Sequence, residues 1–471
     1  MGRTEVAASG RGGKRSWWLE QALGGEKDAP TLSGAVNADV CIVGGGFTGM
    51  WTALRIKERE PSTDVVIVEA DVCGGGASGR NGGFALTFWH HFLGLERICG
   101  GEEAVRLARA SEEAVADIGR FCDENGVDAQ FRPDGWLWTA TNAAQQGAWA
   151  STVDAIGRHG RHPFQALSPE DAAYRAGSPA HQSGVFEATA ASVQPALLAR
   201  GLRRVVLERG VQIFERSPMT RLERSSTLRV HTQNGSVSAG RVVLAMNAWS
   251  AQMRELGKAL VIVSSDVVLT APIPEDVRPA GWSEGVCISD SRLMVNYFRP
   301  TPEGRLVFGK GGGRLAYGGR VGPSFNGGSG DVAWVEHDLR RLYPALRDVP
   351  VTHNWIGPID RSLDGLPFFT TLGRPDLICG AGFSGNGVGP SVLGGRILAS
   401  MTLGRADEWS SCGLVRRPAG GLPPEPFRYV GGRMVRGAVA RKERAEDSGS
   451  TPGWLDIRLA QLAPPGLVPL D

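Results

Sequence analysis

The stretch from Ala38 to Ala70 constrains the fold more than any other part of the chain. It reads ADVCIVGGGFTGMWTALRIKEREPSTDVVIVEA, which is an apolar strand, a glycine-rich turn, an amphipathic helix and a second apolar strand ending in a carboxylate. This order is typical of the first βαβ unit of a dinucleotide-binding fold. We therefore expect an α/β protein with a Rossmann-like domain.

The glycines of this stretch follow the G-x-G-x-x-G spacing. Gly44 allows the tight turn, Gly46 lets the backbone approach a pyrophosphate, and Gly49 lets the helix pack on the strand. The helix, predicted over residues 47–59, then directs its first N–H groups and its positive dipole end at the phosphates. The expected phosphate-binding positions are Gly44, Gly46, Phe47, Thr48 and Gly49.

Glu69 ends the second strand, 25 positions after Gly44. A carboxylate at this distance is placed to accept hydrogen bonds from the adenosine ribose, with Ala70 beside it. It also argues against NADP, because an acidic side chain repels the extra phosphate. The first motif alone is equally consistent with an NAD-dependent dehydrogenase.

Composition excludes several classes of protein. The 51 basic and 49 acidic residues nearly balance and form no basic block, so we expect no nucleic-acid partner. No apolar run reaches the ~18 residues that cross a bilayer, so we expect no integral membrane segment. The seven scattered cysteines suit reduced thiols in a cytoplasmic protein. We expect no metal site, because the adjacent His90 and His91 would point in different directions.

The dinucleotide-type segments fall in three separate pieces. Helical patterns fill residues 94–162, strands dominate residues 258–351, and the Pro- and Gly-rich tail contains one expected helix, Gly437 to Asp447. This predicts a Rossmann-like domain interleaved with an α+β substrate domain on a mostly antiparallel sheet. The expected boundaries are an N-terminal arm at 1–35, the dinucleotide-binding domain at 36–93, 185–257 and 352–404, the substrate domain at 94–184 and 258–351, and a C-terminal extension at 405–471.

A second glycine-rich turn follows the short strand Asp376 to Cys379. The sequence GAGFSGNGVGPS then leads into an apolar helix, so a second group of free N–H donors stands at a second positive dipole end. Such donors stabilise the negative charge of a reduced flavin ring. Two anion-receptive helix starts fit FAD, whereas NAD needs only the first. Close helix–sheet packing is the alternative explanation of these glycines.

Four motifs together resemble the D-amino-acid-oxidase-type family of FAD-dependent oxidoreductases, nearest its gamma-glutamylputrescine oxidoreductase-like branch. They are the strand–turn–helix unit, the loop Gly74 to Gly83, the strand end Val242 to Ser250, and the segment Asp364 to Ser391. The resemblance covers roughly residues 17–404 and implies FAD. Beyond the first motif it implies cofactor contacts at Ser78, Arg80, Asn81, Gly82, Gly83, Met219, Asn247, Gly382, Phe383, Ser384, Gly385, Asn386, Gly387 and Val388. For Arg80 and Asn81 the alternative is a surface charge and a left-handed turn residue.

The resemblance implies removal of a hydride from the carbon next to a primary or secondary amine, which gives an imine. Relatives attach flavin through a Cys where this chain has Gly357, and carry a Lys for oxygen where it has Val307. We therefore expect noncovalent FAD and leave oxidase or dehydrogenase open, together with the oligomeric state. A flavin-binding protein without catalytic function is a further alternative. The substrate-pocket candidates are Tyr297, Arg299, Trp355 and Asn386.

Overall fold

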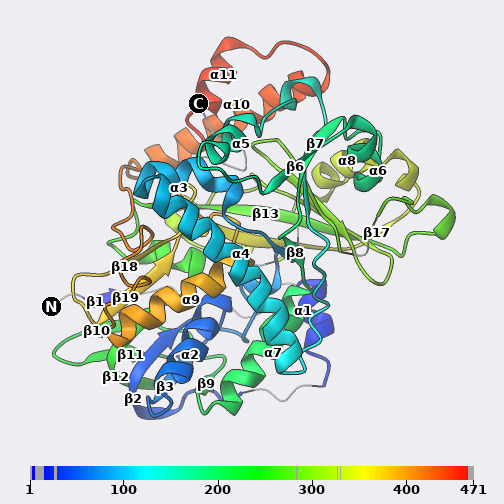
Figure 1. The fold of residues 1–471 in the computed structure, drawn as a ribbon. Coiled ribbons are helices and arrows are strands. Elements are labelled where there is room, and N and C mark those ends of the chain that lie inside the picture. Colours follow the sequence, from blue (N-terminus) through cyan, green and yellow to red (C-terminus); the bar gives the residue numbers. More distant parts are fainter. Residues whose placement is uncertain are drawn as a thin grey trace.

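The computed structural model describes residues 3–5, 15–25, 29–282, 285–325, 327–328 and 330–464. The rest of the predicted N-terminal arm, residues 1–2, 6–14 and 26–28, lies outside this part, as do residues 465–471 of the predicted extension. Two large β-sheets organise the described chain (Figure 1).

The first sheet has nine strands and a parallel centre. Strands β12, β2, β3 and β9 pair in parallel, and β19 pairs in parallel with β12. Strand β3 reads VVIV and is buried throughout, as expected for a parallel strand that is covered on both faces. The strands are β1 (Arg3–Glu5), β2 (Gly34–Val43), β3 (Val65–Val68), β9 (Gln212–Phe214), β10 (Arg221–Arg224), β11 (Leu228–His231), β12 (Gly235–Leu244), β18 (Phe368–Thr371) and β19 (Leu377–Ala381).

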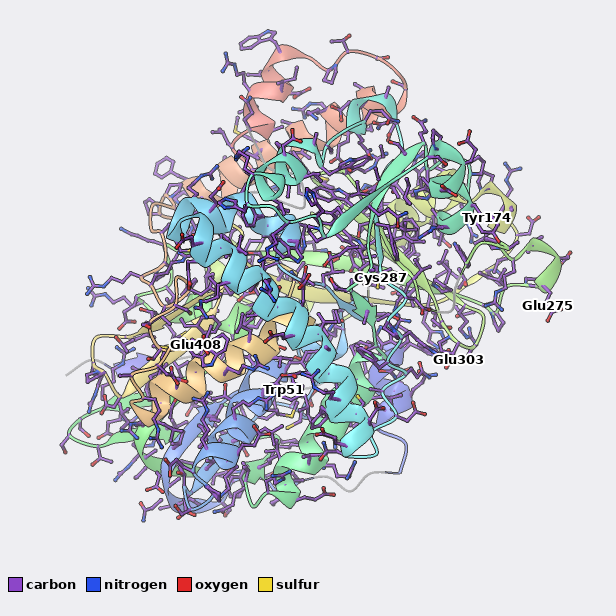
Figure 2. All side chains as sticks on the ribbon, viewed as in Figure 1. Trp51, Tyr174, Glu275, Cys287, Glu303 and Glu408 are labelled. Carbon is purple, nitrogen blue, oxygen red and sulfur yellow. The ribbon has the colours of Figure 1, made fainter. Side chains whose placement is uncertain are left out.

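Helices α2 (Phe47–Arg59), α4 (Gly101–Glu124), α7 (Pro195–Glu208) and α9 (Val388–Leu403) cover one face of this sheet (Figure 1). Helices α2 and α9 cross closely because a Cβ at Gly395 would lie only 2.6 Å from the Cβ of Trp51. The Trp51 side chain is fully buried between the helices (Figure 2). This contact fixes the starts of α2 and α9 relative to each other, which matters for the site.

The second sheet has eight strands and is antiparallel except for the parallel pair β14 and β5. Its apolar core includes Phe298 and Phe308, whose rings stack with centroids 5.1 Å apart. The strands are β5 (Trp136–Ala140), β6 (Phe164–Leu167), β7 (Ser183–Glu187), β13 (Leu260–Thr270), β14 (Cys287–Asp290), β15 (Asn296–Pro300), β16 (Leu306–Lys310) and β17 (Val351–Ser362); β4 (Phe84–Ala85) and β8 (Ala191–Ser192) form a separate pair.

The remaining helices lie around these sheets. The α-helices are α1 (Trp17–Ala22), α3 (Phe92–Cys99), α5 (Ala150–Gly157), α6 (Pro169–Ala176), α8 (Val332–Leu342), α10 (Phe427–Asp447) and α11 (Trp454–Ala460). The 3-10 helices are η1 (Ala77–Gly79), η2 (Trp89–His91), η3 (Ala143–Gln145), η4 (Asn247–Gln252), η5 (Glu275–Val277), η6 (Tyr317–Gly319), η7 (Pro323–Phe325) and η8 (Pro344–Leu346). No helix of the described chain is both long and apolar enough to cross a bilayer.

The α/β class, the Rossmann-like sheet and the mostly antiparallel second sheet are as predicted. Strand β17 pairs with β13 in the second sheet, although residues 352–404 were expected to lie wholly in the dinucleotide-binding domain. The division into domains stays a prediction. The expected C-terminal helix is corrected: α10 begins at Phe427, ten residues before Gly437, and α11 follows it. Gly431 and Gly432 have low helix propensity, so the sequence does not predict this first half as helix.

Candidate functional site

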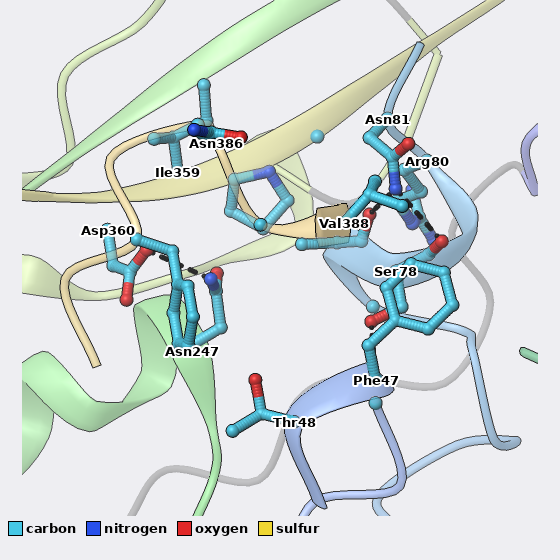
Figure 3. Close-up of a pocket in the computed structure, with 18 of the residues that line it drawn as sticks. Phe47, Thr48, Ser78, Arg80, Asn81, Asn247, Ile359, Asp360, Asn386 and Val388 are labelled. Atoms are coloured by element: carbon cyan, nitrogen blue, oxygen red, sulfur yellow. Dashed lines mark hydrogen bonds between the residues drawn. The ribbon is translucent and has the colours of Figure 1, made fainter. Parts of the chain in front are cut away.

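A pocket runs between the two sheets, from the start of α2 to strands β13, β14 and β15 (Figure 3). Most of the predicted positions line it. The lining residues among them are Gly44, Gly46, Phe47, Thr48, Glu69, Ala70, Ser78, Arg80, Asn81, Gly82, Met219, Asn247, Tyr297, Phe383, Ser384, Gly385, Asn386, Gly387 and Val388.

The first end of the pocket is built from main chain. Gly44 has φ +114°, and a Cβ there would lie 2.4 Å from the carbonyl oxygen of Ala245, so only glycine fits. Helix α2 has Gly46 at its N-cap, without a side-chain cap from that residue. The Phe47 N–H donates to Ser78 Oγ at 2.9 Å, while the next N–H groups of the first turn lack intrahelical acceptors. This end therefore presents donors and a positive dipole end to an anion.

Glu69 closes this end of the pocket. Its carboxylate accepts from the N–H groups of Gly45 and Asp71, at 2.7 and 2.8 Å. Burial raises its pKa to about 7, against these hydrogen bonds. Hydroxyl donors of a bound ribose would favour the ionised form, so the group suits a nucleotide ribose.

The loop after β3 passes the middle of the pocket. Asn81 fixes its shape, because Nδ2 donates to the carbonyls of Ala77 and Ser78 and Oδ1 accepts from Gly83 N–H at 2.7 Å. The buried Arg80 donates to the carbonyls of Gly75 and Ile356. Burial lowers the Arg80 pKa to about 10, which leaves the guanidinium charged at neutral pH. The loop thus supplies a fixed positive charge along the pocket.

The second glycine turn forms the other main-chain wall. Helix α9 starts at Val388 and has no side-chain cap at Gly387, so its first N–H groups lack intrahelical acceptors. Gly387 and Val388 line the pocket, which places this helix start at the pocket wall (Figure 3). Asp360 supports the turn by accepting from Gly382 N–H at 2.6 Å and from Asn247 Nδ2 at 2.9 Å. Burial raises the Asp360 pKa to about 7.

The far end of the pocket consists of side chains from distant segments. Tyr297 shares a 2.8 Å hydrogen bond with Ser265, and its ring meets Phe84 edge-on at 5.8 Å. Asn386 Nδ2 donates to the carbonyl of Thr87 at 3.0 Å. Within the described residues, Asn386 Oδ1 is buried without a hydrogen-bond partner, as is Nδ1 of His90. These orphaned atoms make this end suitable for a polar ligand group.

Two histidines and one arginine complete this end. The rings of His90 and His91 lie 4.2 Å apart, and both residues line the pocket with Arg361. Burial, followed by the charge of Arg361, lowers the His91 pKa to about 4. Burial lowers the His90 pKa well below its ordinary value. Both imidazoles are therefore neutral at neutral pH.

Two substrate-pocket candidates lie outside the pocket and are corrected. The buried guanidinium of Arg299 donates to the carbonyls of Gly82, Val193 and Pro300 and lies 5.0 Å from the Trp18 ring, so it stabilises a loop and does not line the pocket. Trp355 is fully buried behind the same loop. Its Nε1 donates to the carbonyl of Arg80 at 2.8 Å.

Three predicted glycines also do not line the pocket. A Cβ at Gly49 would lie 2.0 Å from the carbonyl oxygen of Gly44, which is the expected close helix–strand packing. At Gly83 it would lie 2.1 Å from the carbonyl oxygen of Val193, and at Gly382 it would meet the Phe368 ring. At these positions the glycines allow close packing of the chain.

Sequence reasoning missed several lining residues. Asp360, Arg361 and Ser265 lie on long strands, where the sequence gives no sign of which face meets the pocket. In the sequence, the adjacent pair His90 and His91 bears only on whether a metal is bound. Within the described residues, no group of three or more His, Cys, Asp or Glu side chains could hold a metal ion. The adjacent histidine pair is visible in the sequence, but its place at the pocket wall and the neutral state of both rings are seen only in the structure.

The pocket offers groups that match both ends of FAD. Two helix starts without an N-cap side chain of their own, 387–388 and 46–47, open onto one continuous pocket. Within the described residues, the buried Asn247 Oδ1 and Trp249 Nε1 in its wall also lack partners. A molecule with a pyrophosphate at one end and a polar ring at the other satisfies these groups, so the residues fit FAD.

Comparisons with known proteins support this assignment. The model of the family described as FAD dependent oxidoreductase, DAO, matches residues 39–401. The chain is 29% identical to the probable oxidoreductase OrdL of Rhizobium meliloti, over 90% of this chain and 94% of that protein. It is 28% identical to the gamma-glutamylputrescine oxidoreductase of Escherichia coli, over 88% and 93%.

The fold is also similar to solved structures. The crystal structure of glycine oxidase from Geobacillus kaustophilus matches with a TM-score of 0.65 at 22% identity, covering 81% of this chain and 99% of that chain. The crystal structure of L-proline dehydrogenase from P. horikoshii matches with a TM-score of 0.62 at 18% identity, covering 82% and 100%. The family match and the fold agree, and the chain belongs to the DAO family of FAD-dependent oxidoreductases.

Proposed function

We propose that this oxidoreductase binds FAD noncovalently in the pocket and oxidises a primary or secondary amine at the carbon next to nitrogen, giving an imine. The observation that carries the proposal is the convergence of the α2 and α9 starts on one pocket. When bound, FAD accepts the hydride equivalent. The protein's task is to hold the cofactor, orient the amine and limit access of water.

Each cofactor part has residues suited to it. The first turn of α2 holds the pyrophosphate, and Glu69 accepts from the ribose. The first turn of α9 and the charged Arg80 stabilise negative charge on the ring. Among the described cysteines, none lines the pocket, which supports noncovalent binding.

The substrate end suits an amine in its neutral form. His90 and His91 are neutral at neutral pH, so neither repels a bound amine as a cation would. Asn386 Oδ1 and His90 Nδ1 are free to form hydrogen bonds. The amide oxygen accepts from the amine N–H, which leaves the nitrogen lone pair available to stabilise the developing imine.

Oxidase and dehydrogenase activity remain two versions of this proposal. Lys310, the nearest lysine in sequence to the position where relatives use one for oxygen, is buried with Asp338 and donates to Asn296. It is therefore engaged in a structural ion pair. This arrangement favours an acceptor other than oxygen. The unpaired cysteines of the described residues favour a reducing compartment, and we place the protein in the cytoplasm.

Purified full-length protein tests the proposal. We expect a yellow preparation whose flavin is released by denaturation, and anaerobic bleaching of its colour by at least one amine in a panel of primary, secondary and carboxylated amines. A colourless protein that binds NAD would support the NAD-dependent dehydrogenase alternative. A yellow protein that no amine bleaches, but that keeps its flavin, would support a non-catalytic function.

A further inference from the structure

The C-terminal extension carries a surface unlike the rest of the molecule. Helices α10 and α11 pack together and project at the edge of the molecule (Figure 1). Val439 of α10 and Ala460 of α11 form a small core with Met294, and Arg441 pairs with Asp456. Both helices lie beyond residue 401, where the match to the family model ends. Their outer surface therefore lies outside the part of the chain that the family model describes.

Large apolar side chains are exposed on this outer surface. Of the ten large hydrophobic residues exposed in the described chain, seven lie on α10, on α11 or two residues beyond it. Phe427, Val430 and Met434 follow the i, i+3, i+7 spacing of one helix face and are 70%, 53% and 56% exposed. The seven are Phe427, Val430, Met434, Trp454, Leu455, Ile457 and Leu462. Together they exceed the scattered apolar residues that are normal on a surface.

On the same two helices, acidic and basic side chains differ in exposure to solvent. The acidic side chains are all mostly buried, and each has a cation partner: Glu443 and Asp447 pair with Arg292, Glu446 with Lys442, and Asp456 with Arg441. The charged residues exposed on α10 and α11 are all arginines. They are Arg433, Arg441, Arg444 and Arg458. The outer surface is thus apolar and basic.

We propose that α10 and α11 dock the protein onto an anionic membrane surface. Apolar side chains combined with arginines on an exposed helix are the pattern of a helix that lies in the lipid headgroup region. The arginines pair with lipid phosphates while residues such as Phe427 and Trp454 enter the acyl boundary. A second copy of the chain is disfavoured because a two-fold contact sets the same arginines against each other.

Vesicle binding by the full-length holoprotein tests the proposal. We expect sedimentation with vesicles of phosphatidylcholine and phosphatidylglycerol, much weaker sedimentation with phosphatidylcholine alone, and release by high salt. The variant F427S/V430S/M434S should bind the mixed vesicles at least about tenfold more weakly, since one buried apolar side chain alone carries roughly that factor. The variant R433Q/R444Q/R458Q should lose about fivefold per arginine on mixed vesicles and nothing on neutral ones.

A matched control uses exposed apolar residues elsewhere. Tyr174 on α6 lies away from α11 (Figure 2), so Y174S/L207S should bind vesicles as the wild type does. Flavin content and melting temperature show that each variant is folded. Equal vesicle binding by wild type and F427S/V430S/M434S, or no binding by the wild type, would overturn the proposal. Concentration-dependent dimers that disappear in this variant would assign the surface to a second copy and overturn it as well.

Discussion

The two ends of the pocket differ in composition: backbone groups form most of one end, and side chains form the other. The end at α2 consists mainly of backbone N–H groups, glycine turns and the two carboxylates of Glu69 and Asp71, most of them within residues 44–82. The opposite end consists of side chains such as Ser265, Tyr297 and Arg361, which come from three strands of the second sheet. One end depends on local chain conformation and the other on long-range packing.

This difference suggests that one end of the pocket binds the cofactor and the other selects the substrate. Backbone donors at a helix start recognise a phosphate whatever molecule carries it, so the first end can change little without losing the cofactor. Side chains on paired strands can change one at a time while the sheet keeps its register. We therefore expect substitutions at the α2 end to abolish flavin binding, and substitutions at the opposite end to change activity while flavin stays bound.

The largest expected effect is that of Gly46→Asp. A carboxylate at the start of α2 would meet the pyrophosphate within about 4 Å, which costs about 4 kcal/mol, or roughly a thousandfold in FAD affinity. Its Cβ would also lie 2.9 Å from Ser78 Oγ. Flavin fluorescence during dialysis measures the loss. Gly420→Asp, at an exposed glycine with open space around it, should retain full occupancy. Full occupancy in Gly46→Asp would contradict the pyrophosphate assignment.

A substitution of Asp360 tests the second glycine turn, in which a side chain holds backbone N–H groups in place. Asp360→Ala leaves Gly382 N–H and Asn247 Nδ2 without their acceptor, which should lower the free energy of unfolding by about 3 kcal/mol. Denaturant titration of the holoprotein measures this. Asp376→Ala, which removes a partly exposed ion pair with Arg374, should cost less than about 1 kcal/mol. Equal losses in the two variants would show that the turn does not depend on Asp360.

The pH dependence of the same carboxyl gives an independent check. Its folded pKa of about 7 lies above the ordinary value, so the folded state keeps the proton that an unfolded chain releases near pH 4. The contribution of this group to stability is therefore present below about pH 4 and is lost as pH rises to about 7. Asp360→Asn removes this dependence. An unchanged slope of stability against pH in that variant would refute the raised pKa.

The contrast between the two ends also explains what the sequence could predict. The helix Phe47–Arg59, the carboxylate Glu69 and both glycine turns were predictable, since each follows from a pattern within a few dozen residues. Arg299 was misplaced because a strand residue can face either side, and its guanidinium turned toward three carbonyls instead. The place of Arg361 depends on how β17 pairs with β13, which spacing alone does not reveal.

Asn386→Leu tests the end of the pocket that side chains form, and its expected effect is of intermediate size. Loss of the amide oxygen that faces the pocket should lower kcat/KM for the amine by about 10- to 100-fold, corresponding to ~1.4 to 3 kcal/mol, while flavin stays bound. Rapid anaerobic flavin reduction and absorbance measure the two quantities. Asn125→Leu, at a helix end, controls for general destabilisation. Unchanged reduction kinetics with full flavin would remove Asn386 from the substrate site.

The smallest expected effect concerns His91. Its pKa of about 4 results first from burial and then from the charge of Arg361, so Arg361→Gln should raise it by about one pH unit or less. Histidine-selective NMR of the holoprotein measures the titration. Arg444→Gln, on the C-terminal helix, should leave it unchanged. An identical His91 titration in wild type and Arg361→Gln would show that the two side chains do not interact.

The sign of this shift links the substrate end to stability. An unfolded histidine takes up a proton near pH 6.5 and the folded His91 only near pH 4, so wild-type stability falls as pH drops between these values. Arg361→Gln raises the folded pKa of His91, which is the lower limit of this pH range. Stability should therefore fall less steeply as pH drops. At neutral pH His91 is neutral in both proteins, so an altered activity there would come from the loss of the Arg361 side chain at the pocket wall and not from the histidine. Comparing wild type with Arg361→Gln at pH 5 and at pH 8 thus separates the effect of the Arg361 charge on His91 from the effect of losing the Arg361 side chain at the pocket wall.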